Sequence, residues 1–547
     1  MATLAVHTKG EVQRFAFSPG PALFRLLVAA EVPIRCGCNG LGGCGLCLVR
    51  VIAGSADAPA PLEALHLDDA QLAAGVRLAC QVVPRGNLEV EVLATAARPA
   101  WRWLRHDETA PPWVPLPAAH PAATDSARTR AASAGRLGVA VDLGTTTLSL
   151  SLFDLATGHW RAGCRGPNPQ ALFGQDILTR LMAAIESSAQ AGQMSQAVVE
   201  AIGLAISGLA IRARAQTADI AAVTVVANPS MLALLTGDRI ARLIDPRSWS
   251  QPLTCHPTDL AAWALAWGID AAARIDLVAP LAGLIGSDLL AGLIATGLTD
   301  AADPGLLIDF GTNSELALWD GTTLWATSAA GGPAFEGSGL GCGLPAEPGA
   351  IDRLVFRDER PVWHVIGGGP PHGLCGTGLV DLIAGLRRAG QLTERGRFAP
   401  EVPATVPPTG FALAAGGHGV RLSGADVDLF QAAKAAIGAG VALLLEHAGL
   451  EVASLGRVCV GGTFGSGLDI ANAQAIGLLP AIPPARVELC GNTALAGARA
   501  LLLAPEPGAR LTAIRAQARV INLAREPDFD DRFLDQLYLR PLTGRSR

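Results

Sequence analysis

Residues 138–154 read GVAVDLGTTTLSLSLFD, and residues 305–321 read GLLIDFGTNSELALWDG. Each stretch is an apolar strand, a D-x-G-T turn and a second apolar strand, and the two stretches align residue by residue. A strand–turn–strand unit that recurs so far along a chain indicates a fold built from two similar halves. The repeat predicts an α/β architecture in which residues 137–303 and 304–547 form equivalent subdomains.

The D-x-G-T turn carries chemistry that suits phosphate groups. Its backbone N–H groups and Thr hydroxyls can donate to phosphate oxygens, and the Asp at the strand end, Asp142 or Asp309, can hold Mg2+ through water. One such turn is weak evidence, because Asp and Gly are common in turns. Two turns at equivalent places predict a clamp around the phosphates of a nucleotide.

A third glycine run, VCVGGTFGSG at 458–467, follows an apolar strand and precedes a helical pattern. Its backbone could lie against the adenine or ribose of the same nucleotide, although a plain strand-to-helix turn has the same pattern. The chain contains no G-x-x-x-x-G-K-[ST] motif, which excludes a P-loop as the phosphate site.

Four cysteines near the N-terminus form a second motif. Cys38, Cys44 and Cys47 lie in CNGLGGCGLC, and Cys80 lies in RLACQ. The C-x5-C-x2-C spacing with a remote fourth Cys is one residue longer than the plant-type ferredoxin pattern, and the intervening glycines let the backbone approach a cluster closely. A [2Fe-2S] cluster is favoured over a zinc knuckle or packed thiols, and Cys36 is a fifth candidate that could replace Cys38 or stay a free thiol.

Composition limits the class of protein. At 547 residues the chain needs two or three domains. Charged residues make up 16% of the chain, the net charge is −6, and the only lysines are Lys9 and Lys434. The sequence therefore contains no basic patch that would indicate nucleic-acid binding. The most apolar later stretch is broken by Asp288, and no signal segment is evident, so we expect no membrane partner and a cytoplasmic protein.

The remaining cysteines agree with a reducing compartment. Their scattered single positions do not resemble a disulfide framework. They are Cys164, Cys255, Cys342, Cys375, Cys459 and Cys490.

The pattern before residue 137 predicts a small module and a linker. Residues 3–8 and 11–17 indicate a hairpin, residues 21–30 a helix and residues 77–93 closing strands, so residues 1–93 form a β-rich domain. Residues 94–136 are rich in Pro, Ala and Arg, which is typical of a linker, and its three tryptophans suggest that it docks rather than floats.

The turns resemble the phosphate 1, phosphate 2 and adenosine motifs of the ATPase fold shared by actin, sugar kinases and heat-shock chaperones. Joined to an N-terminal ferredoxin, they resemble the reductive activators of corrinoid-dependent enzymes. The segments that carry this resemblance are CNGLGGCGLC, RLACQ, VDLGTTT, NPQALFGQDILTRL, VVANPSMLALLTG, LAGLIGSDLLAG, LLIDFGTNSE, GGPAFEGSGLGCG, GLCGTGLVDLI, AAKAAIGAG, GGTFGSGLD and GNTALAGA.

The resemblance implies a multidomain α/β protein, a β-grasp ferredoxin-like domain followed by a duplicated actin-like (ribonuclease H-like) ATPase fold. It implies a [2Fe-2S] cluster, ATP and Mg2+ as cofactors. The expected partners are a corrinoid protein or cobalamin-dependent methyltransferase and an upstream low-potential reductant, and a homodimer is left open. The implied activity is ATP-dependent return of Co(II) corrinoid to Co(I) by one electron from the cluster.

Site residues follow from the same resemblance. The cluster ligands would be Cys38, Cys44, Cys47 and Cys80. Mg2+ and the phosphates would be surrounded by Asp142, Gly144, Thr145, Thr146, Asp309, Gly311, Thr312 and Asn313. The nucleoside would be approached by Gly461, Gly462 and Gly465. Glu315 and Glu336 would orient the attacking water or be structural carboxylates, and Lys434 would lie near the nucleotide or be an ordinary helix Lys.

Two other functions stay open, and the chain is expected to differ from the family in one respect. The chain could donate electrons to another low-potential enzyme, as the activators of 2-hydroxyacyl-CoA dehydratases do. It could also be a non-redox actin-like kinase or hydantoinase-type protein with structural cysteines. Because only about forty residues separate the first module from Leu137, we expect the family's middle domain to be missing or vestigial.

Overall fold

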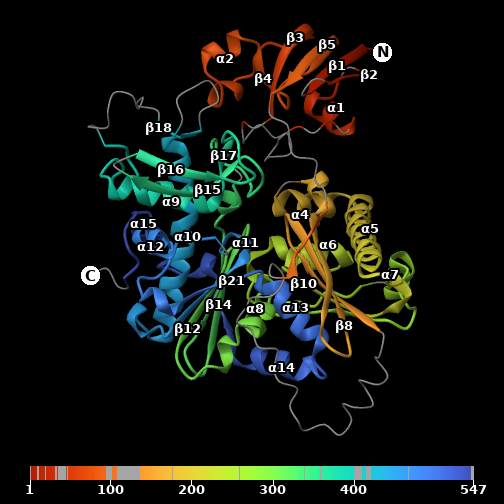
Figure 1. Ribbon diagram of the computed structural model, residues 1–547, viewed down its shortest axis with the longest axis vertical. Helices are drawn as coiled ribbons and strands as arrows, with labels where there is room; N and C mark the ends of the chain where they lie inside the picture. The colour runs from red at the N-terminus through yellow and green to blue at the C-terminus, as the bar shows by residue number, and fades with distance from the viewer. Residues whose placement is uncertain are drawn as a thin grey trace. The chain divides into compact units, whose positions relative to one another are not determined.

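The computed structural model describes residues 2–8, 11–18, 20–30, 32, 34, 45, 47–93, 101–106, 136–174, 176–257, 259–337, 339–357, 360–399, 410–413, 420–465 and 467–543. These residues form two compact units, one from the first hundred residues and one from most of the later chain (Figure 1). Each unit has its own sheets and hydrophobic core.

The first unit consists of β1 Ala2–Thr8, β2 Glu11–Phe17, α1 Leu23–Ala29, β3 Leu48–Ala56, α2 Asp69–Ala73, β4 Val76–Leu78 and β5 Pro84–Val92. Its sheet has the order β2-β1-β5-β3-β4, in which only the β1/β5 pair is parallel. The apolar face of α1, with Leu23 and Leu27, packs on Leu4 and Val90 of the sheet. A mixed sheet that covers one helix is the predicted β-grasp fold.

A buried ion pair fixes the connection between β3 and β4. The guanidinium of Arg77 donates to the Glu63 carboxylate at 2.7 to 3.1 Å, and the backbone N–H of Leu78 donates to it at 2.8 Å. Burial alone would raise the pKa of Glu63, but these hydrogen bonds outweigh it and hold the pKa below its usual value. Arg77 also donates to the carbonyl oxygen of Asp57, so the pair ties this connection to the strand that precedes Cys80.

The first half of the second unit is built on a six-stranded sheet. Its strands are β6 Arg102–Trp103, β7 Leu137–Leu143, β8 Thr147–Asp154, β9 Trp160–Pro167, β10 Ile220–Ala227 and β11 Arg274–Leu277. They lie in the order β11-β10-β7-β8-β9-β6. The first three strands of this order are parallel, and the others alternate in direction.

The second half repeats this arrangement. Its strands are β12 Gly305–Asp309, β13 Ser314–Trp319, β14 Leu324–Ala329, β20 Arg457–Gly461, β21 Val487–Gly491 and β22 Ala518–Val520, in the order β21-β20-β12-β13-β14-β22. β7 corresponds to β12, and β8 to β13, with the same directions relative to their neighbours apart from the last strand. The predicted duplication is confirmed.

The remaining elements cover or extend the two sheets. The helices are α4 Ile177–Glu186, α5 Ser188–Ala213, α6 Pro229–Thr236, α7 Leu260–Trp267, α8 Ser287–Thr296, α9 Gly376–Arg388, α10 Gly424–Ala448, α11 Gly462–Gly465, α12 Ile470–Ala475, α13 Thr493–Leu503, α14 Pro507–Gln517 and α15 Phe529–Gln536. The remaining strands are β15 Ala350–Arg357, β16 Arg360–Val365, β17 Gly373–Leu374, β18 Phe411–Ala412 and β19 Arg421–Leu422.

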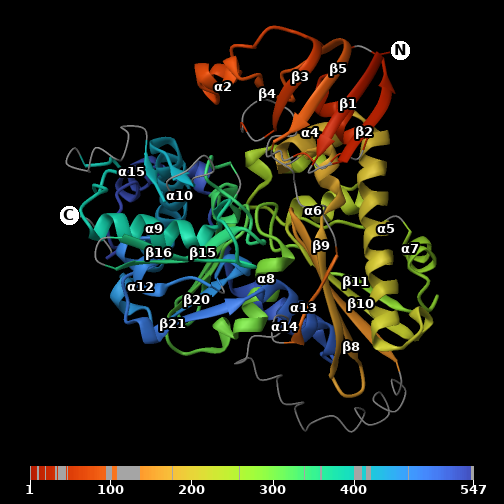
Figure 2. The ribbon, with the colours of Figure 1, turned by 45° about the horizontal axis from the view of Figure 1, so that its top comes forward.

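Helices α8 and α13 lie between the two sheets (Figures 1 and 2). Their buried side chains share one apolar cluster with residues of both halves, among them Ala140 of β7 and Leu307 of β12. The two helices contact each other, and each also contacts strands of a sheet. The core of the second unit is therefore continuous across the repeat, and it holds the two D-x-G-T turns in a common frame.

Among the residues that the structure describes, two helices, α5 and α10, are long and apolar enough to cross a membrane. Both pack on sheets of the second unit instead, α5 on β8 and β9 and α10 on β13 and β14. Half of the most apolar window of α5 is buried, and 78% of that of α10. Helices in the core of a globular fold have this composition, so they are weak evidence for a membrane span.

Part of the predicted linker belongs to the second unit. β6 pairs with β9, and Leu104 is buried in the core. The Trp101 indole fills the space above Gly166, where a Cβ atom would lie 2.6 Å from the ring. The expected docking of the tryptophans is therefore seen for residues 101–106, whereas Trp113 lies outside the described residues.

Glu63→Ala should lower the stability of the first unit by about 3–5 kcal/mol, because Arg77 would stay buried without its partner. Glu91→Ala, which removes the exposed partner of Arg50, is the matched control and should cost at most about 1 kcal/mol. Hydrogen exchange of the β1 and β5 amides, read by mass spectrometry, measures this unit separately. Equal loss of protection in the two variants would contradict the prediction.

Candidate functional site

The two repeated aspartates meet at the start of α13. The Asn492 side chain donates to Oδ2 of Asp142 at 2.7 Å, and the Thr493 hydroxyl donates to Oδ2 of Asp309 at 3.0 Å. Asn492 also caps α13 by accepting from the N–H of Leu495. Two adjacent residues of one helix terminus thus hold the equivalent carboxylates of both halves.

Two further carboxylates, Asp288 and Glu315, lie in the same acidic cluster. Burial raises the pKa of Asp142 and of Asp309 to about 6. Burial, together with the charges of Asp309 and Asp142, raises the pKa of Asp288 to about 7. Burial and the charges of Asp288 and Asp309 raise the pKa of Glu315 well above its usual value. Carboxylate oxygens that repel one another in such a cluster are suitable ligands for a hard divalent cation such as Mg2+.

Glu336 joins the two turns. Its Oε2 atom accepts from the hydroxyl of Thr146 at 3.1 Å and from that of Thr312 at 3.2 Å. Burial raises the pKa of Glu336, although these bonds act in the opposite direction. One threonine of each turn, Thr146 and Thr312, therefore contacts the same carboxylate, which brings the two turns together.

Buried polar side chains hold the first turn in place. Asn228 donates to the hydroxyl of Thr145 at 2.9 Å, and Arg180 donates to the carbonyl oxygen of the same residue at 2.8 Å. Asn168 donates to the carbonyl oxygen of Gly144 at 2.9 Å. In the second turn, Gly311 and Asn313 follow Asp309, and a Cβ atom on Gly311 would lie 3.0 Å from the carbonyl oxygen of Asn313.

The third glycine run lies beside Asp309. β20 leads into Gly461, where a Cβ atom would lie 3.0 Å from the carboxyl carbon of Asp309. Gly462 has a φ of +85°, and a Cβ atom there would lie 2.1 Å from the carbonyl oxygen of Phe310. Gly465 packs against Val460. The run is close to the acidic cluster, and its contact with the nucleoside stays a prediction.

Lys434 is not brought to this cluster. It is fully buried in α10, and its Nζ donates to the carbonyl oxygen of Tyr538 at 3.0 Å. The neighbouring Gln431 donates to the carbonyl oxygen of Leu537, so both side chains hold the C-terminal segment. The interpretation of Lys434 as a nucleotide-binding residue finds no support in this geometry.

Sequence reasoning missed several residues of the site. Asp288, Asn228, Asn492 and Thr493 all lie in segments that carry the family resemblance, but their roles depend on contacts across the fold. One signal was available, since Asp288 is a single charge inside the apolar stretch LAGLIGSDLLAGLIATGL. A buried acid in such a stretch indicates a site rather than a surface.

Two of the four candidate cluster ligands are described. Cys47 and Cys80 are buried, with their sulfur atoms 3.4 Å apart, and the Gln81 side chain donates to Cys80. Gly45, two residues before Cys47, has a φ of +67°, which favours glycine. Thiols at this spacing fit a shared iron–sulfur centre. The candidates Cys36, Cys38 and Cys44 lie outside the described residues.

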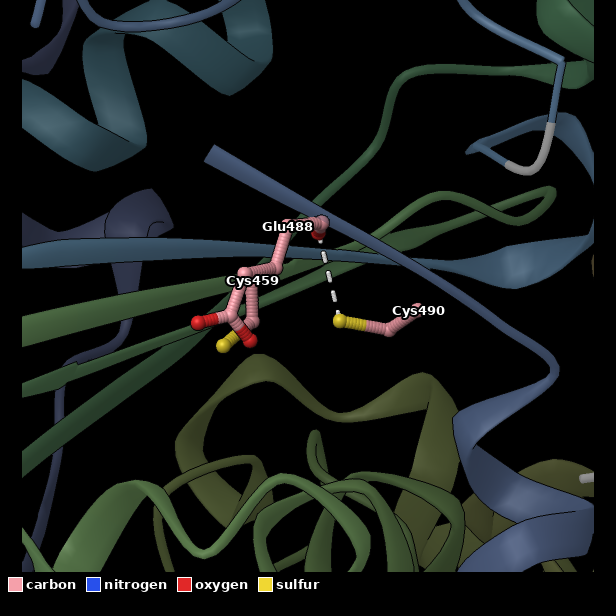
Figure 3. Close-up of side chains that lie close together, drawn as sticks. All are labelled: Cys459, Glu488 and Cys490. Carbon is pink, nitrogen blue, oxygen red and sulfur yellow. Dashed lines mark hydrogen bonds between the residues drawn. The ribbon is translucent and has the colours of Figure 1, made fainter. Parts of the chain in front are cut away.

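Two thiols and a carboxylate lie close together in the second unit (Figure 3). The ligand atoms of Cys459, Glu488 and Cys490 are within 4.8 Å of one another, a proximity that no other group of three such residues reaches in the described part of the chain. Both thiols are buried among apolar side chains, and Glu488 is paired with Arg457 at 3.1 Å. The thiols pack in the core and the carboxylate has an arginine partner, so we favour the acidic cluster as the cation site.

Three family profiles match in order along the chain. The 2Fe-2S iron-sulfur cluster binding domain matches residues 6–85, the RACo middle region residues 137–301, and the C-terminal ASKHA domain of RACo residues 303–544. The corrinoid activation enzyme RamQ of Eubacterium limosum is 30% identical over 426 residues, which are 73% of this chain and 69% of that protein. The chain belongs to the RACo family.

Other comparisons agree with this assignment. The solved structure of a reductive activator for corrinoid, iron-sulfur protein covers 99% of both chains, with 27% identity and a TM-score of 0.64. The [Co(II) methylated amine-specific corrinoid protein] reductase of Methanosarcina barkeri is 30% identical over 243 residues, which are 40% of this chain and 42% of that protein.

Family membership confirms the fold and the cofactors predicted from the sequence. The first unit is a [2Fe-2S] domain and not a zinc knuckle, and the ASKHA domain brings ATP and Mg2+. One expectation was wrong. The family's middle region is present, because it matches residues 137–301, which form the first half of the duplicated fold rather than a separate insertion.

Asp288→Asn should lower ATP hydrolysis about 10–100-fold and raise the Mg2+ concentration required, because one charge of the acidic cluster is lost. Asp276→Asn is the matched control. It neutralises a partly buried carboxylate on β11 that is paired with Arg274 at 2.7 Å. A Mg2+ titration of the hydrolysis rate separates the two. Asp288→Asn with the Mg2+ requirement of the unaltered chain would contradict this assignment.

The free energy of unfolding should increase as the pH rises from about 7 towards 10, because Lys434 loses its proton at a lower pH in the folded chain than in the unfolded chain. Burial lowers the pKa of Lys434 in the folded chain to about 7, while the unfolded chain keeps the ordinary value of 10.5, so the unfolded state binds more protons in this window. Lys434→Met should flatten that rise. Thermal unfolding at several pH values measures it, and a Lys434→Met curve that is as steep as that of the unaltered chain would count against a depressed pKa.

Proposed function

We propose that this chain is an ATP-dependent reductive activator that returns the Co(II) corrinoid of a partner protein to Co(I). The observation that carries the proposal is one polypeptide that joins a [2Fe-2S] domain to a duplicated phosphate clamp with a buried acidic cluster. Two relatives of the chain are named for corrinoid activation and for reduction of a Co(II) corrinoid protein. Corrinoid activation and Co(II) reduction are activities that a [2Fe-2S] domain joined to an ATP-binding domain could carry out.

The chemistry requires an energy source. A plant-type cluster supplies one electron at roughly −400 mV, and the transfer to Co(II) runs uphill. Co(II) gains this electron to become Co(I), and a low-potential reductant must resupply it. ATP can drive such a transfer only by binding one conformation of the protein or of its complex better than another.

Residues of the chain have separate parts in this scheme. The thiols of Cys47 and Cys80, with Cys38 and Cys44, would hold the cluster. Mg2+ and the phosphates of ATP would lie among Asp142, Asp309, Asp288, Thr145, Thr146, Thr312 and Asn313, with the backbone of Gly144 and Gly311. Glu336, which accepts from one hydroxyl of each turn, would orient the attacking water.

The partner is a corrinoid protein or the corrinoid-carrying component of a methyltransferase. We place the reaction in the cytoplasm, where a reducing environment protects the thiols; none of the six later cysteines forms a disulfide. Whether the chain acts as a monomer or a homodimer is measured by sedimentation.

The test mixes reconstituted protein, a low-potential reductant and a Co(II) corrinoid protein without oxygen and follows the visible spectrum. ATP should convert the Co(II) spectrum to that of Co(I). Cys80→Ser, which removes a cluster ligand, and Asp309→Asn, which alters the Mg2+ site, should each abolish the ATP-stimulated change. Conversion that is equally fast without ATP, or with Cys80→Ser, would overturn the proposal.

A further inference from the structure

Arg165 is a cation at the edge of the acidic site. It lies on β9, where its backbone pairs with Ser149 of β8 and with Arg102 of β6. Its Nη2 atom donates to the hydroxyl of Thr147 at 3.2 Å. Thr147 closes the first D-x-G-T turn, since its carbonyl oxygen accepts from the N–H of Gly144 at 3.0 Å. The guanidinium is therefore anchored on the phosphate loop itself.

The charge of Arg165 acts on carboxylates of both walls of the site. It lowers the pKa of Asp142, which lies in the first half, although burial has the larger, opposite effect. It acts in the same way on Glu336, whose carboxylate contacts Thr146 and Thr312. Together with its contact to Thr147, this places the guanidinium beside the first turn.

The site needs such a cation to bind ATP. Five carboxyl groups, those of Asp142, Asp288, Asp309, Glu315 and Glu336, surround it, and the phosphates of ATP add further negative charge. Mg2+ offsets part of this charge. Lys434, which the sequence suggested for the role, is buried against Tyr538. A guanidinium is suited to the remaining charge, because its planar donors bind phosphate oxygens in pairs.

We propose that Arg165 binds the terminal phosphate of ATP and so lets the site distinguish ATP from ADP. The proposal rests on the proposed function of the site as an ATPase. When nucleotide enters, the γ-phosphate takes donors of the guanidinium, including the one that otherwise faces Thr147. ADP lacks this group and leaves Arg165 where it is.

Arg165 also stabilises the hydrolysis step. A water oxygen forms a bond to the γ-phosphorus, the bond from that phosphorus to the bridging oxygen breaks, and a proton of the water passes to the phosphate product, so that ADP and phosphate leave. Arg165 keeps its protons and forms no covalent bond. Its positive charge offsets the negative charge on the transferred group while that group is between the two oxygens.

The test uses the full chain with Mg2+, ADP and a non-hydrolysable ATP analogue. Arg165→Gln should weaken binding of the analogue about 10–100-fold and leave the Kd for ADP within about twofold, as expected for the loss of one charge-assisted phosphate contact. The hydrolysis rate should fall by about 10³-fold. Arg165→Lys should restore part of the affinity but less of the rate, because Lys binds phosphate as a point charge.

Arg161→Gln is the matched control. Arg161 lies on the same strand, but it donates to the carbonyl oxygen of Ala213, away from the turns. Its replacement should change neither affinity. An equal loss for ADP and the ATP analogue in Arg165→Gln would assign Arg165 a structural role and overturn the inference, and so would unchanged binding of both.

These outcomes are independent of the corrinoid assay. A chain that fails to reduce Co(II) corrinoid but loses ATP selectivity in Arg165→Gln would refute the proposed function and support the role of Arg165. A chain that activates its partner while Arg165→Gln binds both nucleotides normally would do the reverse.

Discussion

The contacts of Asn492 and Thr493 with Asp142 and Asp309 are the interaction on which the second unit depends. Asp142 and Asp309 end the central strands of two separate sheets, and burial disfavours the charge on each. Adjacent residues at the start of α13 supply a hydrogen-bond donor to each carboxylate. Because α13 also packs with α8 between the sheets, the donors are held by the same core that joins the two halves.

The acidic cluster is unfavourable for folding by itself. Asp288 and Glu315 lie beside other carboxylates, and burial, which has the largest effect, together with repulsion from these charges raises the pKa of both. Buried like charges lower stability unless a cation or proton offsets them. The hydrogen bonds that Thr493 donates to Asp309 and Ser328 donates to Glu315 reduce this cost without removing it. Stability and function are therefore opposed in the same few residues.

The sequence predicted the parts of the fold that are encoded locally. The turns after Asp142 and Asp309, the hairpin of the first unit and the cysteine spacing are each contained in a short stretch, so their patterns were sufficient. Asn492 contacts Asp142 from a segment 350 residues away. Asp288 and Arg165 are nearer in sequence, but the packing of α8 and the pairing of β9 with β8 bring them to the site. Lys434, a candidate for nucleotide binding, is buried in α10 with its Nζ on the carbonyl oxygen of Tyr538, a contact that the sequence pattern alone does not show.

Strand β9 connects the nucleotide site to the segment that follows the first unit. The side chain of Arg165 contacts the first turn, and its backbone pairs with Arg102 of β6. β6 has only two residues, and the ring of Trp103 packs beside Arg212 while it stays partly exposed. Two-residue edge strands contribute little stability by themselves. The same arginine therefore contacts the first turn with its side chain and holds the two-residue strand β6 with its backbone.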